Sequence, residues 1–206
     1  MRDDLRIDWT IPATPAGWEG GLERFMGPGR SRVELAVELG GGAVTAGLLG
    51  LLIWRGPERD AWSWPQTLVV VLIALDLVGG VLTNATNAAK RWYHRDANPW
   101  PRLGFVASHL LHLTAVGLLL LGQDWTWSLS NAVLLLGSAV LIERIPAEGK
   151  RPVAMAAFMV ALIVNLALFP LPPSLAWIPP LFYLKLLVGH LVPEAPLYRR
   201  DGPRGY

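Results

Sequence analysis

Long apolar runs constrain this chain more than any other feature of its sequence. Six stretches approach or reach the roughly 20 residues that an α-helix needs to cross the hydrocarbon core of a bilayer. They are Val33–Trp54, Pro65–Ala88, Gly104–Gly122, Thr126–Ile142, Pro152–Phe169 and Ser174–Val192. Parts of these runs are apolar on every face, as contact with lipid requires. The sequence therefore predicts an all-α fold, a polytopic integral membrane helical bundle of six transmembrane helices.

Composition and the placement of tryptophan agree with a membrane bundle. Of the 206 residues, 52% are hydrophobic and only 17% are charged, against a charged fraction of about 25% in soluble domains. Tryptophans gather at or just beyond the ends of the runs, where aromatic belts form at membrane interfaces. They are Trp54, Trp62, Trp64, Trp92, Trp100, Trp125, Trp127 and Trp177. The chain has no cysteine, which excludes disulfides, thiolate metal sites and cysteine nucleophiles.

The distribution of Lys and Arg predicts the topology. With six spans, the N-terminal segment, the second and fourth loops and the C-terminal tail share one side. That side holds Arg2, Arg6, Arg24, Arg30, Arg32, Lys90, Arg91, Arg95, Arg102, Arg144, Lys150, Arg151, Arg199, Arg200 and Arg204, whereas the opposite side holds only Arg55 and Arg59. By the positive-inside rule both termini are expected in the cytoplasm, with the protein in the inner (plasma) membrane.

Three regions follow from these boundaries. Residues 1–32 are expected to form a cytoplasmic or interfacial N-terminal segment, residues 33–192 the six-helix transmembrane domain, and residues 193–206 a cytoplasmic tail. Polar residues inside the spans concentrate toward the cytoplasmic end, and such groups are costly in a membrane and commonly functional. The second span also carries a predicted polar stripe at helical spacing, made of Asp76, Gly80, Thr83, Asn87 and Arg91.

The polar band contains groups suited to metal-dependent chemistry. His109 and His112 stand three residues apart and share a helical face, and His190 at the end of the sixth span is expected at the same depth. These three histidines are the predicted metal ligands, for zinc or iron, because imidazole nitrogen suits both metals. Glu38, Glu194 or Asp76 completes the site, which keeps an open position for water.

A function follows from this ligand set as a prediction. A metal-bound water is a nucleophile at neutral pH, and a remaining carboxylate such as Glu38 serves as general base. Asn84 and Asn87 are expected to orient a substrate headgroup or stabilise a developing oxyanion. The sequence predicts a metal-dependent integral membrane enzyme, such as a hydrolase, acting on a lipid or another amphipathic small molecule. Glu194 stands as a further ligand or base.

A mid-membrane charge pair supplies the main alternative. Asp76 and Lys185 each lie about ten residues from the outer ends of their spans, so they reach a similar depth and are expected to pair. Paired charges at that depth also serve proton-coupled transporters and channels. Haem binding between His109 and His190 and a purely structural or assembly role are further alternatives.

Membrane lipids are the expected surroundings, and the net charge of +2 gives little reason to expect a nucleic-acid partner. Gly42, Ala46 and Gly50 recur every four residues on the first span. Such a small-residue face allows close helix packing, either within the chain or in a homo-oligomer.

Overall fold

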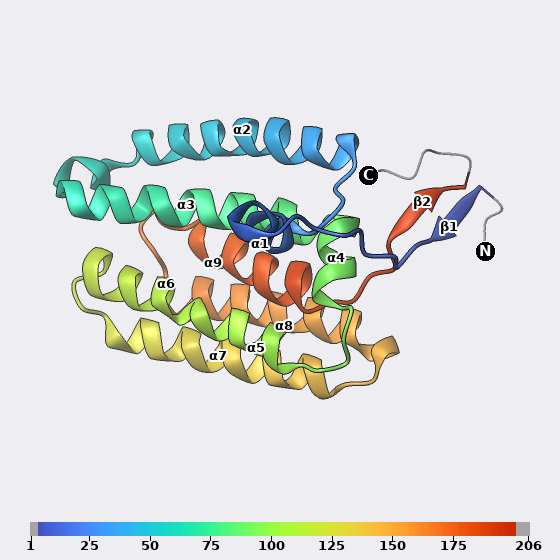
Figure 1. The fold of residues 1–206 in the computed structure, drawn as a ribbon. Helices are drawn as coiled ribbons and strands as arrows, with labels where there is room; N and C mark the ends of the chain where they lie inside the picture. Colours follow the sequence, from blue (N-terminus) through green and yellow to red (C-terminus); the bar gives the residue numbers. More distant parts are fainter. Residues whose placement is uncertain (1–3, 201–206) are drawn as a thin grey trace.

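The computed structural model describes residues 4–200, and it is mostly helical (Figure 1). Arg2 and Arg204, two of the cations used to predict the topology, lie outside the described residues. So does the predicted tail beyond residue 200.

Within residues 4–200, five helical segments are long and apolar enough to cross a membrane. They are α2 (Arg32–Arg55), α3 (Trp64–Asn84), a continuous segment from Trp100 to Leu120, α7 (Trp125–Arg144) and α8 (Ala147–Leu168). The third of these consists of α5 (Trp100–Ser108), α6 (Leu110–Ala115) and the π-helical turn η2 (Val116–Leu120). Capping boxes begin α2 at Ser31 and α3 at Ser63. In each, the backbone amide of the serine donates to the side chain of the residue three positions later, Glu34 or Gln66.

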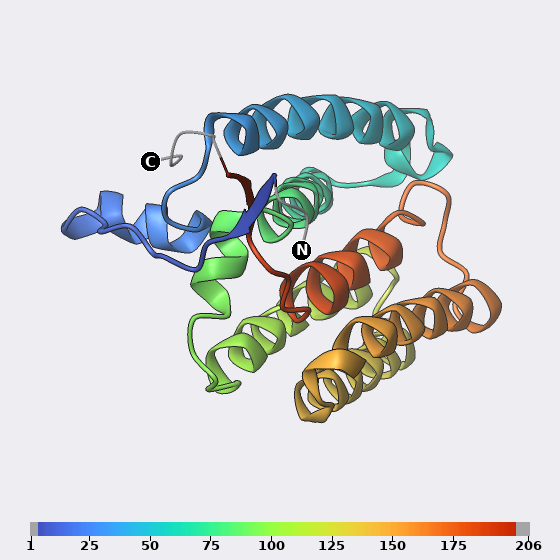
Figure 2. The same cartoon turned by 90° about the vertical axis from the view of Figure 1, so that its right-hand side faces the viewer.

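The sixth predicted span is different in the structure. Residues 174–192 form a short helix α9 (Ile178–Tyr183) that continues as the π-helical segment η3 (Leu184–His190). Neither segment is of membrane-spanning length, but both are packed inside the protein against α3 and α8, with α7 beside η3. Figures 1 and 2 show this helix in the middle of the bundle. A helix enclosed by protein need not match the thickness of a bilayer, because other helices surround it.

The outermost helix is α2. It packs on α3 along one side, and Figure 2 shows it at the edge of the bundle. From the predicted small-residue face, Gly42 faces α3, because a Cβ placed there would lie 3.7 Å from Leu82 Cδ1. A Cβ at Gly50 would meet nothing within 4 Å. Packing against α3 therefore accounts for Gly42 but not for Gly50.

The second predicted span ends earlier than expected. Helix α3 stops at Asn84, and a separate helix α4 (Asn87–Tyr93) follows. Thr86 starts α4, since its side chain accepts a hydrogen bond from the Ala89 amide, as an N-cap residue does. The predicted polar stripe is thereby broken, and Asn87 and Arg91 lie on α4 instead of α3.

Both ends of the described chain meet at one end of the bundle. Strand β1 (Leu5–Ile7) pairs antiparallel with β2 (Leu197–Arg199), and Figure 1 shows this pair beyond the ends of the long helices. Helix α1 (Gly17–Met26) follows β1, and the short turn η1 (Pro57–Ala61) joins α2 to α3. The buried Arg91 guanidinium donates to the backbone carbonyls of Thr10, Pro28 and Gly29, which ties the N-terminal segment to α4.

Candidate functional site

Asp76 is the centre of a cluster of ionisable side chains inside the bundle. Its Oδ2 atom lies 2.5 Å from Lys185 Nζ, 2.9 Å from His112 Nε2 and 3.7 Å from His109 Nε2. The Lys185 side chain is only 2% exposed, whereas that of Asp76 is 38% exposed. A single carboxylate thus joins three basic groups from two other elements of the bundle.

The hydrogen bonds define different tautomers for the two histidines. His109 Nδ1 lies 2.8 Å from the Phe105 carbonyl oxygen, and because a carbonyl can only accept, Nδ1 carries the proton. The free lone pair of neutral His109 is then on Nε2, which faces Asp76. His112 presents its Nε2 to the carboxylate, so in the neutral ring that nitrogen carries the proton. His112 Nδ1 is buried without a hydrogen-bond partner.

Asp76, His109 and His112 also form a possible metal-ligand group. One ligand atom from each lies within 4.8 Å of the other two, close enough to share one ion. Metal-binding histidines usually donate their other ring N–H to a carbonyl or carboxylate, as His109 Nδ1 does to the Phe105 carbonyl. Lys185 competes with an ion for Asp76 Oδ2, because both are cations beside the same oxygen.

Local backbone features place these side chains. Gly80 of α3 makes room for Lys185, because a Cβ at that position would lie 2.3 Å from Lys185 Cε. Lys185 itself lies in the π-helical segment η3, a form that is frequent at functional sites. Asn84 Nδ2 donates to the Lys185 carbonyl over 3.3 Å. His109 lies where α5 passes into α6.

A pocket of about 180 Å³ adjoins the cluster. Its walls come from α3, from the ends of α1 and α4, from Phe105 of α5 and from Lys185. Asp76 and Lys185 are its charged residues, and Thr83 and Asn84 add polar groups. Asp76 therefore faces the pocket and also contacts the histidines behind it.

His190 does not join the group that the sequence predicted for it. Its ring packs on Phe105, with centroids 4.3 Å apart, and Phe105 also packs on His109 at 4.7 Å. Both ring nitrogens of His190 are buried without hydrogen-bond partners. Of the predicted ligands, His109 and His112 lie together with Asp76. From η3, Lys185 and not His190 contacts this group.

Glu38 and Asn87, two other predicted site residues, form hydrogen bonds that connect separate segments of the chain. Glu38 accepts hydrogen bonds from Arg30 and from Thr83 of α3. Asn87 exchanges two hydrogen bonds with the backbone of Leu197 in β2. The structure therefore gives Glu38 and Asn87 no contact with the cluster, while Asn84 lies at the pocket wall.

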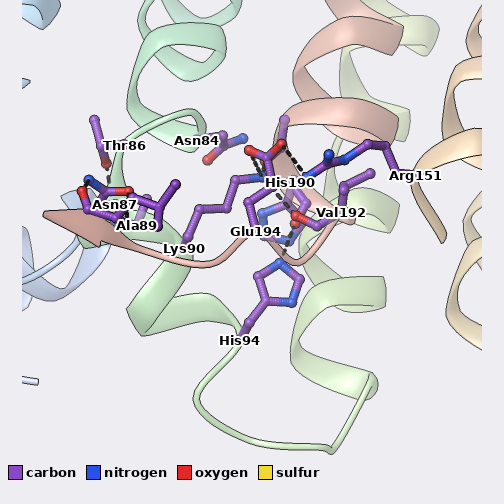
Figure 3. A network of polar contacts seen from close by, with 12 residues as sticks. Asn84, Thr86, Asn87, Ala89, Lys90, His94, Arg151, His190, Val192 and Glu194 are labelled. Atoms are coloured by element: carbon purple, nitrogen blue, oxygen red, sulfur yellow. Dashed lines mark hydrogen bonds and ion pairs between the residues drawn. The ribbon is translucent and has the colours of Figure 1, made fainter. Parts of the chain in front are cut away.

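The end of the central helix is capped by residues around α4 (Figure 3). Lys90 Nζ donates to the carbonyls of Gly189 and Val192 and lies 3.7 Å from Glu194. His94 Nε2 lies 2.9 Å from the His190 carbonyl. Cations near the last carbonyls of a helix are stabilising. Glu194, predicted as a ligand or base, instead lies beside Lys90 and Arg151.

Burial changes the acid–base properties of this cap. It lowers the pKa of Lys90 to about 8, with Glu194 acting in the opposite direction. Burial also lowers the pKa of His94 to about 4, and the nearby charge of Lys90 adds to the effect. His94 is therefore neutral near pH 7.

Sequence reasoning missed a second buried polar network. Tyr183 Oη and Asn165 Nδ2 donate to Asn131 Oδ1 over 2.7 and 2.8 Å. These residues join α9, α8 and α7. The signal was present in the sequence, because an asparagine within a long apolar run needs a hydrogen-bond partner.

Five helices of membrane-spanning length and an interior cluster of ionisable groups are the features of a multi-pass membrane protein. No protein-family model, curated protein or solved structure matches the chain. The function is therefore argued from the geometry of the site.

Proposed function

We propose that this protein is a metal-dependent integral membrane enzyme that acts on a lipid or another amphipathic molecule. The observation that carries the proposal is the position of Asp76, which lines the pocket and lies within a possible metal-ligand group with His109 and His112. Three protein ligands with an open position are typical of catalytic metal sites.

The size of the pocket supports an amphipathic substrate. Pockets that enclose a whole small molecule usually measure about 300–1,000 Å³, and this one measures about 180 Å³. It accommodates the polar end of a molecule whose apolar part remains outside. We further propose that both termini lie in the cytoplasm and that the membrane is the inner (plasma) membrane, on the basis of the Lys and Arg distribution.

Each group then has a role. His109 offers the Nε2 lone pair that its carbonyl bond directs toward Asp76, and His112 would ligate a metal through Nε2 with its proton on Nδ1. A bound divalent metal supplies an activated water molecule. Lys185 moves from Asp76 toward the pocket, where its ammonium group stabilises negative charge on the substrate. Asn84 positions the Lys185 backbone.

Metal binding to the purified protein tests the proposal. The parent, His109→Ala and Lys185→Met proteins are prepared in detergent without chelators and titrated with zinc and iron(II). We expect one metal per chain in the parent, loss of binding in His109→Ala, and tighter binding in Lys185→Met because a competing cation has been removed. Absence of metal from all three proteins would overturn the proposal.

Proton-coupled transport is the second candidate, and the buried Lys185–Asp76 contact favours it. A carboxylate shared by an ammonium group and an imidazole exchanges protons readily when one partner moves. Proton flux into liposomes, measured with an enclosed pH-sensitive dye, distinguishes the two candidates. Transport requires Asp76 and Lys185 but tolerates His109→Ala, whereas the enzyme depends on His109.

A further inference from the structure

Helix α1 carries an apolar face that nothing else in residues 4–200 covers. Trp18, Leu22 and Phe25 are 77%, 55% and 58% exposed. Their spacing of four and three residues places them on one side of the helix. Glu19 and Arg24 lie on other sides, and Arg24 donates to Thr14 Oγ1 over 2.7 Å.

The position of α1 is fixed by contacts at its end. Tyr93 Oη donates to the Phe25 carbonyl over 2.6 Å. Gly27 has a φ of 95° and approaches α4 so closely that a Cβ there would lie 2.4 Å from the Ala89 nitrogen. Arg91 holds the segments on both sides of α1. The exposed face therefore belongs to an anchored helix.

The surroundings of α1 indicate which surface covers this face. Figure 1 shows α1 nearly end-on beside α3, and Figure 2 shows it projecting sideways from the bundle, so that it lies across the direction of α3. The candidate span α2 begins at Arg32, only a short turn after Met26. An amphipathic helix lying across the end of a span is placed in the interfacial layer of a membrane.

We propose that lipid covers the Trp18, Leu22 and Phe25 face, and that the pocket at Asp76 opens to the lipid layer beside the end of α1. Phe25 and Met26 form one wall of this pocket, next to Gly79 of α3. The apolar part of a bound molecule then lies along α1 while its polar end reaches Asp76. Only the identity of that molecule as a substrate rests on the proposed function.

Accessibility of nitroxide labels tests both parts of the proposal, and the absence of native cysteine permits single-site labelling. The variants Leu22→Cys, Glu19→Cys and Gly79→Cys are labelled in phospholipid nanodiscs. Collision with oxygen, which concentrates in lipid, is compared with collision with a water-soluble nickel chelate. Val44→Cys, at an exposed position of α2, is the lipid reference, and Asp96→Cys in the exposed turn after α4 is the water reference.

We expect an oxygen-to-nickel ratio at position 22 that is several times the ratio at position 19. We also expect a lipid-like ratio at position 79, where an added Cβ meets nothing within 4 Å. Equal, water-like ratios at positions 22 and 19 would overturn the lipid contact of α1. A water-like ratio at position 79 would overturn entry from lipid. Neither result depends on metal binding, so failure here is distinguishable from failure of the proposed function.

Discussion

At the scale of single residues, Gly80 permits the contact between Lys185 and Asp76. We expect Gly80→Ala to push the Lys185 ammonium away from the carboxylate, because the new Cβ would lie 2.3 Å from Lys185 Cε. Crowding of this kind costs roughly 1–3 kcal/mol. Thermal unfolding in detergent measures the change.

Gly79→Ala is the matched control for Gly80→Ala. A Cβ at Gly79 meets nothing within 4 Å, and alanine is a better helix former than glycine by about 0.5–1 kcal/mol. The control should therefore be neutral or more stable than the parent. Equal destabilisation by the two alanines would contradict the account of Gly80.

The pair itself is tested by a double-mutant cycle. Lys185→Met leaves the Asp76 carboxylate with the histidines alone, and breaking a buried pair costs about 3–5 kcal/mol. We expect a smaller loss than this, because the Asp76 side chain is 38% exposed and His112 still lies 2.9 Å from it. Adding Asp76→Asn should recover part of the lost stability. If the loss of stability in the double variant equals the sum of the losses in the two single variants, the two residues do not interact.

At the scale of elements, Arg91 joins the N-terminal segment to α4. Arg91→Met would leave the carbonyls of Thr10, Pro28 and Gly29 without their donor, at a cost of about 1–3 kcal/mol for each buried group left unpaired. We expect faster proteolysis of residues 4–31 while the helical bundle stays intact. The control is Arg95→Met, because Arg95 is exposed and its removal leaves the segment protected.

The long helices were predictable from the sequence, because length and apolarity are enough to identify α2, α3, α7 and α8 within a few residues. The break after Asn84 was missed, although Thr86 before a short helical stretch is a typical N-cap. The interior position of α9 was also missed. Hydropathy measures how apolar a segment is. Because lipid and the protein interior are both apolar, it does not distinguish a helix that faces lipid from one that is enclosed by other helices.

The sequence was enough to predict the membrane depth of the site residues, but not which side chains contact one another. Counting residues from the ends of the runs placed Asp76 and Lys185 at one level, and their side chains lie 2.5 Å apart in the structure. The same counting placed His190 level with His109. Which of two residues at one depth faces a given neighbour depends on the rotation of each helix, and the π-helical turns of η3 alter that rotation.

At the scale of the whole molecule, stability should depend on pH through the cap that joins α4 to the central helix. The pKa of His94 is about 4 in the folded protein, below the usual histidine value of about 6.5. Between these values the unfolded chain binds more protons, so stability falls as the pH is lowered from about 6.5 to 4. We expect the unfolding temperature to decrease over this range.

His94→Gln identifies the source of that decrease. The glutamine amide can donate to the His190 carbonyl in place of the imidazole, but it does not titrate. The variant should therefore lose less stability than the parent between pH 6.5 and 4.5. The same slope in both proteins would assign the effect to other groups.

The central position of α9 and η3 has a consequence for synthesis. Residues 178–190 leave the ribosome after the helices that surround them, and Lys185 follows Asp76 by 109 residues. At about 5–20 residues per second, roughly 5–20 s separate the synthesis of Asp76 from that of Lys185. During that interval the earlier helices surround an unfilled centre, so the newly made protein passes through a stage in which a chaperone or protease of the membrane can recognise its open core.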